Sequence, residues 1–297
     1  MDAAESPRGA LTIKGKNMKT LTIVLFRILP TGILSRCFGY AARLPLPAFL
    51  LDRIIHWYSA RFGVKIDEID YPAGGFGSLD AFFTRKLKPG VHVVDKGRTS
   101  IVSPVDARVD QCGEIDGATV FQTKGIGYAL ADLIPSGYHR NFIDGSFMTL
   151  YLSPGDYHRI HSPVAGEVAG YFALPGRLLT VQDFMVRGVP GLFARNERLI
   201  SYIESAGGPV AVVKVGAMNV GRITVCYDDV VTNRAFRRRI EYFYPEGARP
   251  RVEKGGELGA FHMGSTVVLL FGKGAVRLDA FEAGARVRVG QRVAEFR

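Results

Sequence analysis

From residue 100 onward, short runs rich in Val, Ile, Tyr and Phe alternate with Gly and Pro, and this pattern constrains the fold most. Such residues favour strands, whereas Gly and Pro favour turns, so we expect a mainly antiparallel β body. The 35 Gly and 15 Pro in the 297-residue chain agree with frequent turns. The clearest runs are GSFMTLYLSP, GEVAGYFALPG, VAVVKVGAMNVGRITVCY and STVVLLFG.

Helical patterns are concentrated in the first 62 residues. Residues 47–62, PAFLLDRIIHWYSARF, place apolar side chains at helical spacing with polar ones opposite. Weaker helical patterns follow at residues 79–87 and 128–134. We therefore predict an α+β chain, with a basic and apolar helical region over residues 1–62 and a β-rich domain over residues 63–297.

The positive charge of the chain is unevenly distributed. Its formal net charge is +10, and residues 1–100 hold 15 Lys and Arg against 8 Asp and Glu. Residues 21–34, LTIVLFRILPTGIL, are strongly apolar, but Arg27 and Pro30 interrupt them and they are too short to span a bilayer. Basic and apolar segments together favour an anionic lipid surface over nucleic acid. Ordinary core helices with a solvated tail are the open alternative.

The three cysteines, Cys37, Cys112 and Cys226, are widely spaced and form no CxxC pair. A disulfide framework is not expected, which favours a reducing compartment. No small-residue cleavage site follows the apolar segment promptly, so a signal peptide is not expected. These features predict a chain on the cytoplasmic side.

Three short segments contain residue types that strands and turns do not require. SPVDAR contains Asp106, YHRIHSP contains His158 and His161, and FHMGST contains Gly264 and Ser265. The flanks of the histidine pair resemble strands and no third ligand accompanies it, so no metal site is expected. Ser, His and Asp together are typical of an activated nucleophile.

The sequence context of Ser265 indicates its target. Gly264 and Ser265 open a long apolar strand, whereas a hydrolase of the α/β type places its serine at a strand-to-helix turn. Gly264 has no side chain to hinder attack on its own carbonyl group. The peptide bond between the two residues is therefore the expected target, because intramolecular attack is favoured by proximity. A serine hydrolase remains open.

The chain resembles the pyruvoyl-dependent phosphatidylserine decarboxylases. The resemblance runs from about residue 77 to about residue 281, in the order of that family. Three departures are Met263, where the family often has Leu, Arg222, where it often has Ser, and Ala107, where Gly is usual. The matching segments are SLDAFFTRKLKPG, SPVDARV, KGIGYAL, YLSPGDYHRIHSP, FARNERL, VGAMNVGRI and KGGELGAFHMGSTVVLLF.

The resemblance implies a zymogen that cleaves itself. Asp106 would orient His161, which would act as general base on Ser265. The Ser265 hydroxyl would attack the carbonyl of Gly264, and β-elimination with loss of ammonia would leave a pyruvoyl group. The products would be a large chain, residues 1–264, and a small chain, residues 265–297, which stay associated. Further dimerisation remains open.

The resemblance also implies the reaction. Phosphatidylserine would form a Schiff base with the pyruvoyl group and lose CO₂ to give phosphatidylethanolamine in phospholipid biosynthesis, with His158 assisting decarboxylation. No other cofactor is expected. The enzyme would bind peripherally to the cell membrane on the cytoplasmic side. The alternatives are the same chemistry on another serine-headgroup lipid and a non-catalytic lipid-binding β domain.

Other residues carry weaker predictions. Arg85 is a candidate lipid contact in FFTRKL, and Asn196 belongs to a polar cluster expected to form structural hydrogen bonds. His262 is expected to be an ordinary strand residue. His56, His92 and His139 carry no specific signal.

Overall fold

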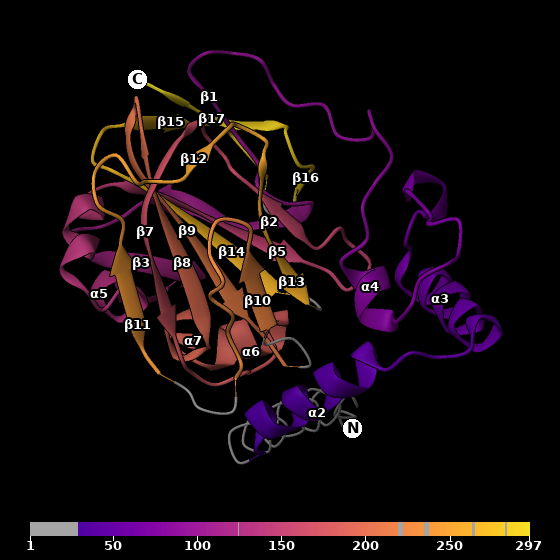
Figure 1. Cartoon of the computed structure of the whole chain (residues 1–297). Helices are drawn as coiled ribbons and strands as arrows, with labels where there is room; N and C mark the ends of the chain where they lie inside the picture. Colours follow the sequence, from indigo (N-terminus) through magenta and orange to yellow (C-terminus); the bar gives the residue numbers. More distant parts are fainter. Residues whose placement is uncertain (1–28, 124, 219–221, 235–237, 263–264, 283) are drawn as a thin grey trace, which may run out of the picture.

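The computed structural model (Figure 1) describes residues 29–123, 125–218, 222–234, 238–262, 265–282 and 284–297. Within these ranges the chain is mainly antiparallel β-sheet with a few helices, so the predicted α+β class is confirmed. Of the predicted site residues, Gly264 lies outside the described ranges, as do residues 1–28 of the helical N-terminal region.

A nine-stranded sheet forms the centre of the molecule, and all of its described pairings are antiparallel. In this sheet β14 (Ser265–Phe271) lies between β5 (Ser146–Leu152) and β9 (Gly208–Gly216), and all seven of its residues pair on both sides. On the β5 side, the order continues to β2 (Ala107–Glu114) and β16 (Arg286–Val287). On the β9 side, it continues to β8 (Arg198–Ser205), β7 (Gly166–Leu174) and β11 (Ile240–Phe243). The short strand β12 (Arg251–Val252) also pairs with β7.

The two faces of the sheet are both buried. Alternate side chains of β14 point to opposite faces, with Val267 and Leu269 in one core and Val268 and Leu270 in the other. A strand covered on both faces has no polar face, which explains the continuous apolar run STVVLLF. The predicted inner strand is therefore confirmed.

Each face has its own cover. The first is packed against two small sheets, β10 (Arg222–Val225) with β13 (Glu257–His262) and β6 (Arg159–His161), and β1 (Ser100–Val102) with β17 (Arg292–Phe296) and β15 (Val276–Leu278). The second is covered by the hairpin β3 (Thr119–Thr123) and β4 (Ile126–Ala129) and by short helices, α5 (Leu130–Leu133), η2 (Gly137–Phe142), α6 (Asp183–Gly188) and α7 (Leu192–Arg195).

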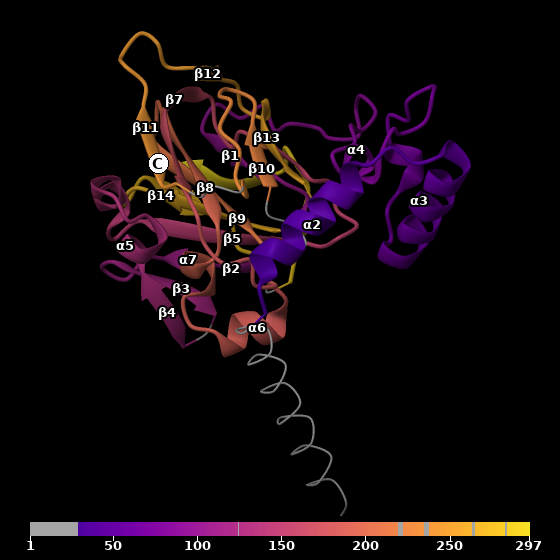
Figure 2. The same ribbon diagram turned by 60° about the horizontal axis from the view of Figure 1, so that its bottom comes forward.

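The N-terminal helices form a third packing unit beside the sheets. They are α2 (Thr31–Arg43), α3 (Ala48–Phe62) and α4 (Leu79–Phe83), with a short turn η1 (Ile66–Glu68) between α3 and α4. Figure 2 shows α2 and α3 along one side of the β body. The predicted helix at residues 47–62 is confirmed, and it ends at Gly63, whose left-handed φ of 72° suits glycine.

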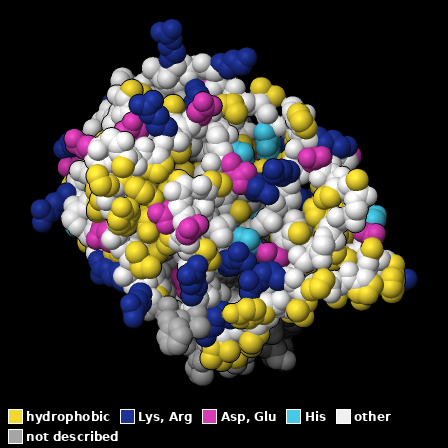
Figure 3. All heavy atoms as spheres, viewed as in Figure 1, with side chains coloured by type: hydrophobic (Ala, Val, Ile, Leu, Met, Phe, Trp, Pro, Cys, Tyr) yellow, Lys and Arg dark blue, Asp and Glu magenta, His cyan; other side chains and the backbone are white. Residues whose placement is uncertain are grey.

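α2 and α3 expose many large apolar side chains. None of the described helices is long and apolar enough to cross a bilayer. Figure 3 shows yellow side chains gathered over these two helices. The exposed residues are Ile33, Leu34, Phe38 and Tyr40 of α2, Leu44 after it, and Phe49, Leu50, Trp57 and Phe62 of α3.

Candidate active site

Ser265 begins β14, where its backbone pairs with Leu152 of β5 and Gly216 of β9. The residue is fully buried, and its hydroxyl makes no hydrogen bond within the described part of the chain. A buried polar atom left without a partner costs about 1–3 kcal/mol. At a predicted nucleophile, this cost indicates a hydroxyl kept free for chemistry.

An apolar cavity of about 410 Å³ lies against Ser265. Its walls come from the N-terminal helices, from the end of β5 and from the segments at residues 180–182 and 217–218. Such a cavity suits the apolar part of a ligand, with few polar groups to fix its orientation. The lining residues are Phe38, Ile54, Trp57, Tyr58, Phe62, Leu79, Phe83, Tyr151, Leu152, Pro154, Thr180, Val181, Gln182, Ala217, Met218 and Ser265.

Buried Asn196 connects two walls of this cavity. Its side-chain amide donates to the carbonyls of Leu179, at 2.8 Å, and Gly216, at 2.9 Å, while its oxygen accepts from the N–H of Leu179 at 3.2 Å. Leu179 precedes the wall segment at residues 180–182, and Gly216 pairs with Ser265. The hydrogen bonds agree with the structural role expected of Asn196.

His158 is fully buried beside the cavity. Its ring lies 5.8 Å from the ring of Phe83, which lines the cavity, and its carbonyl accepts from the N–H of Phe261 at 2.9 Å. Nδ1 donates to the carbonyl of Asp156 at 2.7 Å, which leaves Nε2 with a lone pair and no described partner. Burial, aided by the charge of Arg85, lowers the pKa of His158 to about 3, so the ring is a neutral proton acceptor.

Arg85 supports the loop that carries His158. Its guanidinium is buried and donates to the carbonyls of Gly155, at 2.9 Å, and Asp156, at 3.0 Å. The predicted lipid contact of Arg85 is therefore wrong in this structure, because the side chain is directed into the protein. Its hydrogen bonds hold the backbone oxygen to which His158 donates.

His161 lies at the opposite end of β6 from His158. Its Nδ1 donates to the carbonyl of Gly255 at 2.7 Å, and its Nε2 lies 3.3 Å from the hydroxyl of Tyr157. Burial lowers the pKa of His161, although the hydrogen bond to Gly255 and the charge of Glu257 oppose that shift.

Asp106 hydrogen-bonds with a histidine that carried no sequence signal. Nε2 of His92 lies 2.8 Å from Oδ1 and 3.1 Å from Oδ2 of Asp106, and the N–H of Val289 donates to Oδ1 at 2.8 Å. Burial alone would raise the pKa of Asp106, but the hydrogen bond and charge of His92, the N–H of Val289 and the charge of Arg288 together make the net shift downward.

Among the described residues, no hydrogen bond joins Asp106 to His161, because both side chains have other partners. Ring contacts connect them instead: the Tyr157 ring centroid lies 5.1 Å from that of His92, in a tilted arrangement, and 5.7 Å from that of His161, in a stacked one. The catalytic roles of Asp106 and His161 stay predictions.

The register of β6 and β13 places the two predicted histidines differently with respect to Ser265. His161 pairs with Glu257 at the start of β13, whereas the carbonyl of His158 accepts from Phe261, four residues before Ser265. The structure therefore brings His158 to the Ser265 end of β13. Among the described residues, no cluster of His, Cys, Asp and Glu could hold a metal ion.

Comparison with known proteins agrees with this geometry. The sequence profile of the family described as phosphatidylserine decarboxylase matches residues 79–295. A phosphatidylserine decarboxylase proenzyme of Myxococcus xanthus is 41% identical over 271 residues, which cover 91% of this chain and 96% of that protein.

Two further relatives carry the same name. The protein of Methylococcus capsulatus is 42% identical over 269 residues, covering 89% of this chain and 92% of its own length. The protein of Pseudomonas aeruginosa is 40% identical over 271 residues, covering 89% and 93%. The matches to these relatives extend over nearly the whole of each sequence, and the chain therefore belongs to the phosphatidylserine decarboxylase family.

Proposed function

We propose that this chain is a proenzyme that cleaves itself between Gly264 and Ser265 and then converts phosphatidylserine to phosphatidylethanolamine and CO₂. The observation that carries the proposal is the buried hydroxyl of Ser265, which has no described partner and lines an apolar cavity. Membership of the family supports the same reaction.

Self-cleavage turns Ser265 into the reactive group. Its Oγ bonds to the carbonyl carbon of Gly264 while the amide bond to its own nitrogen breaks, giving an ester. Loss of the Cα proton with cleavage of the Cβ–O bond then releases the Gly264 carboxylate. Water replaces the nitrogen, which leaves as ammonia, and residues 265–297 begin with a pyruvoyl group.

The surroundings of Ser265 fit a pyruvoyl group. A carbonyl group has no hydrogen to donate, so it needs no acceptor partner of the kind a hydroxyl requires, and the wall at this point is apolar. The group supplies a carbonyl that accepts the substrate amine and withdraws the electrons released with CO₂.

His158 and His161 have separate proposed roles. His158 accepts or donates a proton at the reacting carbon of the substrate, since its Nε2 carries a free lone pair beside the cavity. His161 and Asp106 serve self-cleavage, as the resemblance implies. Asp106 is connected to His161 through its contact with His92 and the ring contacts of Tyr157.

The large and small chains stay associated after cleavage. β14 belongs to the small chain, yet it pairs on both sides with strands of the large chain, β5 and β9. Its apolar side chains are buried in both cores, so separation would expose them to water.

Denaturing mass spectrometry tests the proposed self-cleavage. The purified protein should give two masses, residues 1–264 and residues 265–297 with pyruvoyl in place of Ser, whereas Ser265→Ala should give one. Thr149→Val is a matched control, because it removes another buried hydroxyl without a described partner. A single unmodified mass from folded wild-type protein would overturn the proposal.

The processed protein is then assayed with dispersed phosphatidylserine, and CO₂ and phosphatidylethanolamine are quantified. A serine-headgroup lipid with a different backbone is assayed beside it. Faster turnover of the second lipid would replace the substrate but keep the chemistry. Processing without release of CO₂ from either lipid would contradict the decarboxylase function.

We also propose that the exposed apolar side chains of α2 and α3 bind the membrane surface. Phe49→Glu should reduce flotation with vesicles of phosphatidylcholine and phosphatidylglycerol. Val93→Glu is the control, because Phe49 and Val93 are both 74% exposed but lie in different segments. Equal flotation of the two variants would contradict a membrane-binding role for α3.

The proposed position is peripheral, on the cytoplasmic side of the cell membrane. The free state of Cys37, Cys112 and Cys226 agrees with a reducing compartment. Protease added to intact spheroplasts should leave the chain whole and should cleave it after lysis. Cleavage before lysis would place the chain on the outer side.

A further inference from the structure

A second, smaller cavity lies on the other side of α2 from the Ser265 cavity and shares no lining residue with it. Its volume is about 50 Å³. That space is large enough for a few water molecules or one tetrahedral oxyanion, and too small for an acyl chain. The lining residues are Ser35, Arg36, Gly39, Tyr40, Arg43, Asp80, Arg222, Asn233 and His262.

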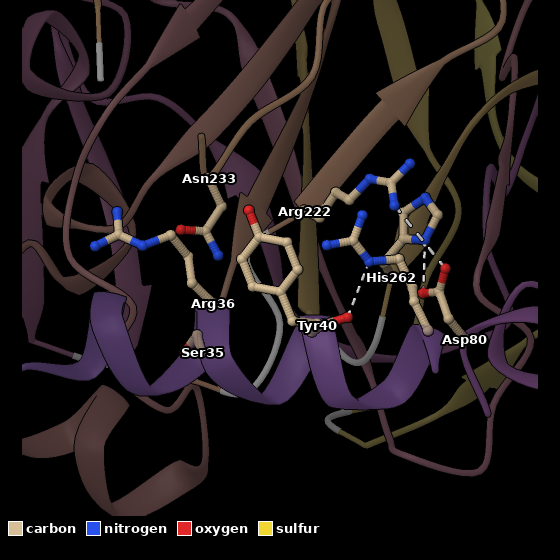
Figure 4. Close-up of a pocket in the computed structure, with 9 residues that line it drawn as sticks. Ser35, Arg36, Tyr40, Asp80, Arg222, Asn233 and His262 are labelled. Atoms are coloured by element: carbon tan, nitrogen blue, oxygen red, sulfur yellow. Dashed lines mark hydrogen bonds and ion pairs between the residues drawn. The ribbon is translucent and has the colours of Figure 1, made fainter. Parts of the chain in front are cut away.

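The charges around this cavity do not balance. Three arginines line it, Arg36 and Arg43 from α2 and Arg222 from β10, against the single carboxylate of Asp80. Asp80 is already engaged, because Nδ1 of His262 donates to its Oδ1 at 2.7 Å. Arg222 lies 4.0 Å from the other oxygen of Asp80. Figure 4 shows Arg222, His262 and Asp80 together at one end of the cavity.

Arg43 and Arg222 repel each other across this space. Burial lowers the pKa of Arg222, Asp80 raises it, and the charges of Arg43 and Arg234 lower it again. Arg43 is held in place by a hydrogen bond from Nε to the carbonyl of Gly39 at 3.0 Å and by stacking on Tyr40, 4.6 Å from the ring centroid. Two guanidinium groups that face one space with a single carboxylate, itself hydrogen-bonded to His262, are typical of an oxyanion site.

Asn233 adds an independent observation. Its side-chain oxygen is buried without a hydrogen-bond partner among the described residues, and Figure 4 shows the side chain directed toward α2. An amide can rotate to present its NH₂ group instead of its oxygen, so Asn233 can donate to a bound anion. A bound oxyanion would thus relieve the repulsion between Arg43 and Arg222 and would give the side-chain amide of Asn233 a hydrogen-bond partner.

We propose that Arg43, Arg222 and Asn233 bind the phosphate ester of an anionic lipid headgroup at a site separate from the Ser265 cavity. The exposed apolar residues Ile33, Tyr40 and Leu44 lie on or next to α2, so the cavity opens beside the surface proposed to contact the membrane. The choice of a lipid as the source of the phosphate rests on that proposed function. The alternative source is free phosphate.

The site is tested on full-length processed protein with two probes. Inorganic phosphate is titrated by calorimetry, and vesicles of phosphatidylcholine with phosphatidylglycerol, without phosphatidylserine, are used for binding. Arg43→Gln and Arg222→Ser should each weaken vesicle binding about tenfold. Arg251→Gln, which removes one exposed arginine charge on β12, outside the cavity lining, should change it less than about twofold.

Each outcome decides the proposal. Loss of vesicle binding in both cavity variants, but not in Arg251→Gln, supports a lipid headgroup. Saturable phosphate binding that both variants abolish, with vesicle binding unchanged, supports the oxyanion site with free phosphate as its ligand. Equal behaviour of all three variants with both probes overturns the site.

The same preparations are analysed for the mass of the fragment 265–297 and for decarboxylation of dispersed short-chain phosphatidylserine. These two measurements test the proposed function without requiring vesicle binding. A processed, active protein that binds neither inorganic phosphate nor the vesicles would overturn the anion site but not the proposed function. An unprocessed protein would overturn the proposed function instead.

Discussion

Nε2 of His92 lies 2.8 Å from Oδ1 of Asp106, and this pair joins the segment before β1 to the loop between β1 and β2. The ring of Tyr157 lies between His92 and His161: it is tilted against His92, with ring centroids 5.1 Å apart, and stacked on His161, with ring centroids 5.7 Å apart. The carboxylate is therefore connected to the predicted histidine through two intervening rings. Removing the side chain of Asp106 or of His92 should therefore disturb the position of His161.

Asp106→Asn should slow self-cleavage about 100-fold or more, because loss of the charge releases His92 and, through it, Tyr157 and His161. His92→Gln should slow it in the same direction. The double variant should be little slower than Asp106→Asn, because the two residues act as one unit. The rate is measured by the appearance of fragment 265–297 after synthesis.

Asp70→Asn is the control for loss of one exposed carboxylate, and it should leave the rate of processing unchanged. Processing of His92→Gln at the wild-type rate would show that Asp106 acts without His92. A direct contact with His161, formed only during cleavage, would then be the better explanation.

Substitutions of the two predicted histidines should affect different steps, decarboxylation for His158 and self-cleavage for His161. His158→Gln should still produce fragment 265–297 but lose decarboxylation by about 100-fold or more, because its free Nε2 lies beside the cavity. His161→Gln should block processing itself. Mass spectrometry and CO₂ release are measured on the same samples. The reverse pattern would exchange the two roles.

Most of the strands could be predicted from sequence, because each is a short apolar run bounded by Gly or Pro. β14 is the clearest case, since burial on both faces leaves an unbroken apolar signal. α3 was predictable from its amphipathic spacing. α2 lies within the helical region predicted over residues 1–62, but its own bounds were not predicted, and the two Gly among its 13 residues weaken the helical signal.

The partners of the site residues could not be predicted. Ser265, His158, His161 and Asp106 were identifiable from their motifs, but a motif does not specify which side chains meet. His92 gave no signal, because its importance arises only from contact with Asp106, 14 residues away. The anion cavity likewise depends on residues from α2, α4, β10 and β13 that are distant in sequence.

The buried state of His158 predicts a pH dependence of stability. Its folded-state pKa is about 3 and its ordinary value is 6.5, so the unfolded chain takes up a proton below pH 6.5 that the folded chain refuses. The free energy of unfolding should therefore fall as pH falls below 6.5, by up to about 1.4 kcal/mol per pH unit from this residue. Above pH 6.5 this contribution is constant.

The slope is measured by urea unfolding in a Ser265→Ala background, which keeps the chain whole. Adding His158→Gln should reduce the slope between pH 6.5 and more acid conditions, while His56→Gln, an exposed histidine on α3, should not. Acidic groups such as Asp156 contribute equally to the pH slopes with and without His158→Gln, so the difference between the two slopes is the contribution of His158. Identical slopes would contradict a buried neutral ring.

The end of α3 is packed closely on the loop that carries His158. Tyr58 donates its hydroxyl proton to the carbonyl of Pro154 at 2.8 Å. A Cβ atom at Gly155 would overlap the carbonyl oxygen of Phe62. Tyr58, Phe62 and Pro154 all line the Ser265 cavity, so this contact sets the distance between two of its walls.

Gly155→Ala should therefore move α3 away from the loop, because neither backbone can yield without displacing the other. We expect a loss of about 1–3 kcal/mol in the free energy of unfolding, together with lower kcat/KM for phosphatidylserine. Gly74→Ala is the matched control, because a Cβ there meets nothing within 4 Å, and it should change stability by less than about 1 kcal/mol. Urea unfolding and CO₂ release measure the two effects. Wild-type stability and activity of Gly155→Ala would mean that α3 does not form this wall, and the substrate cavity would then have to be sought on the β side of Ser265 alone.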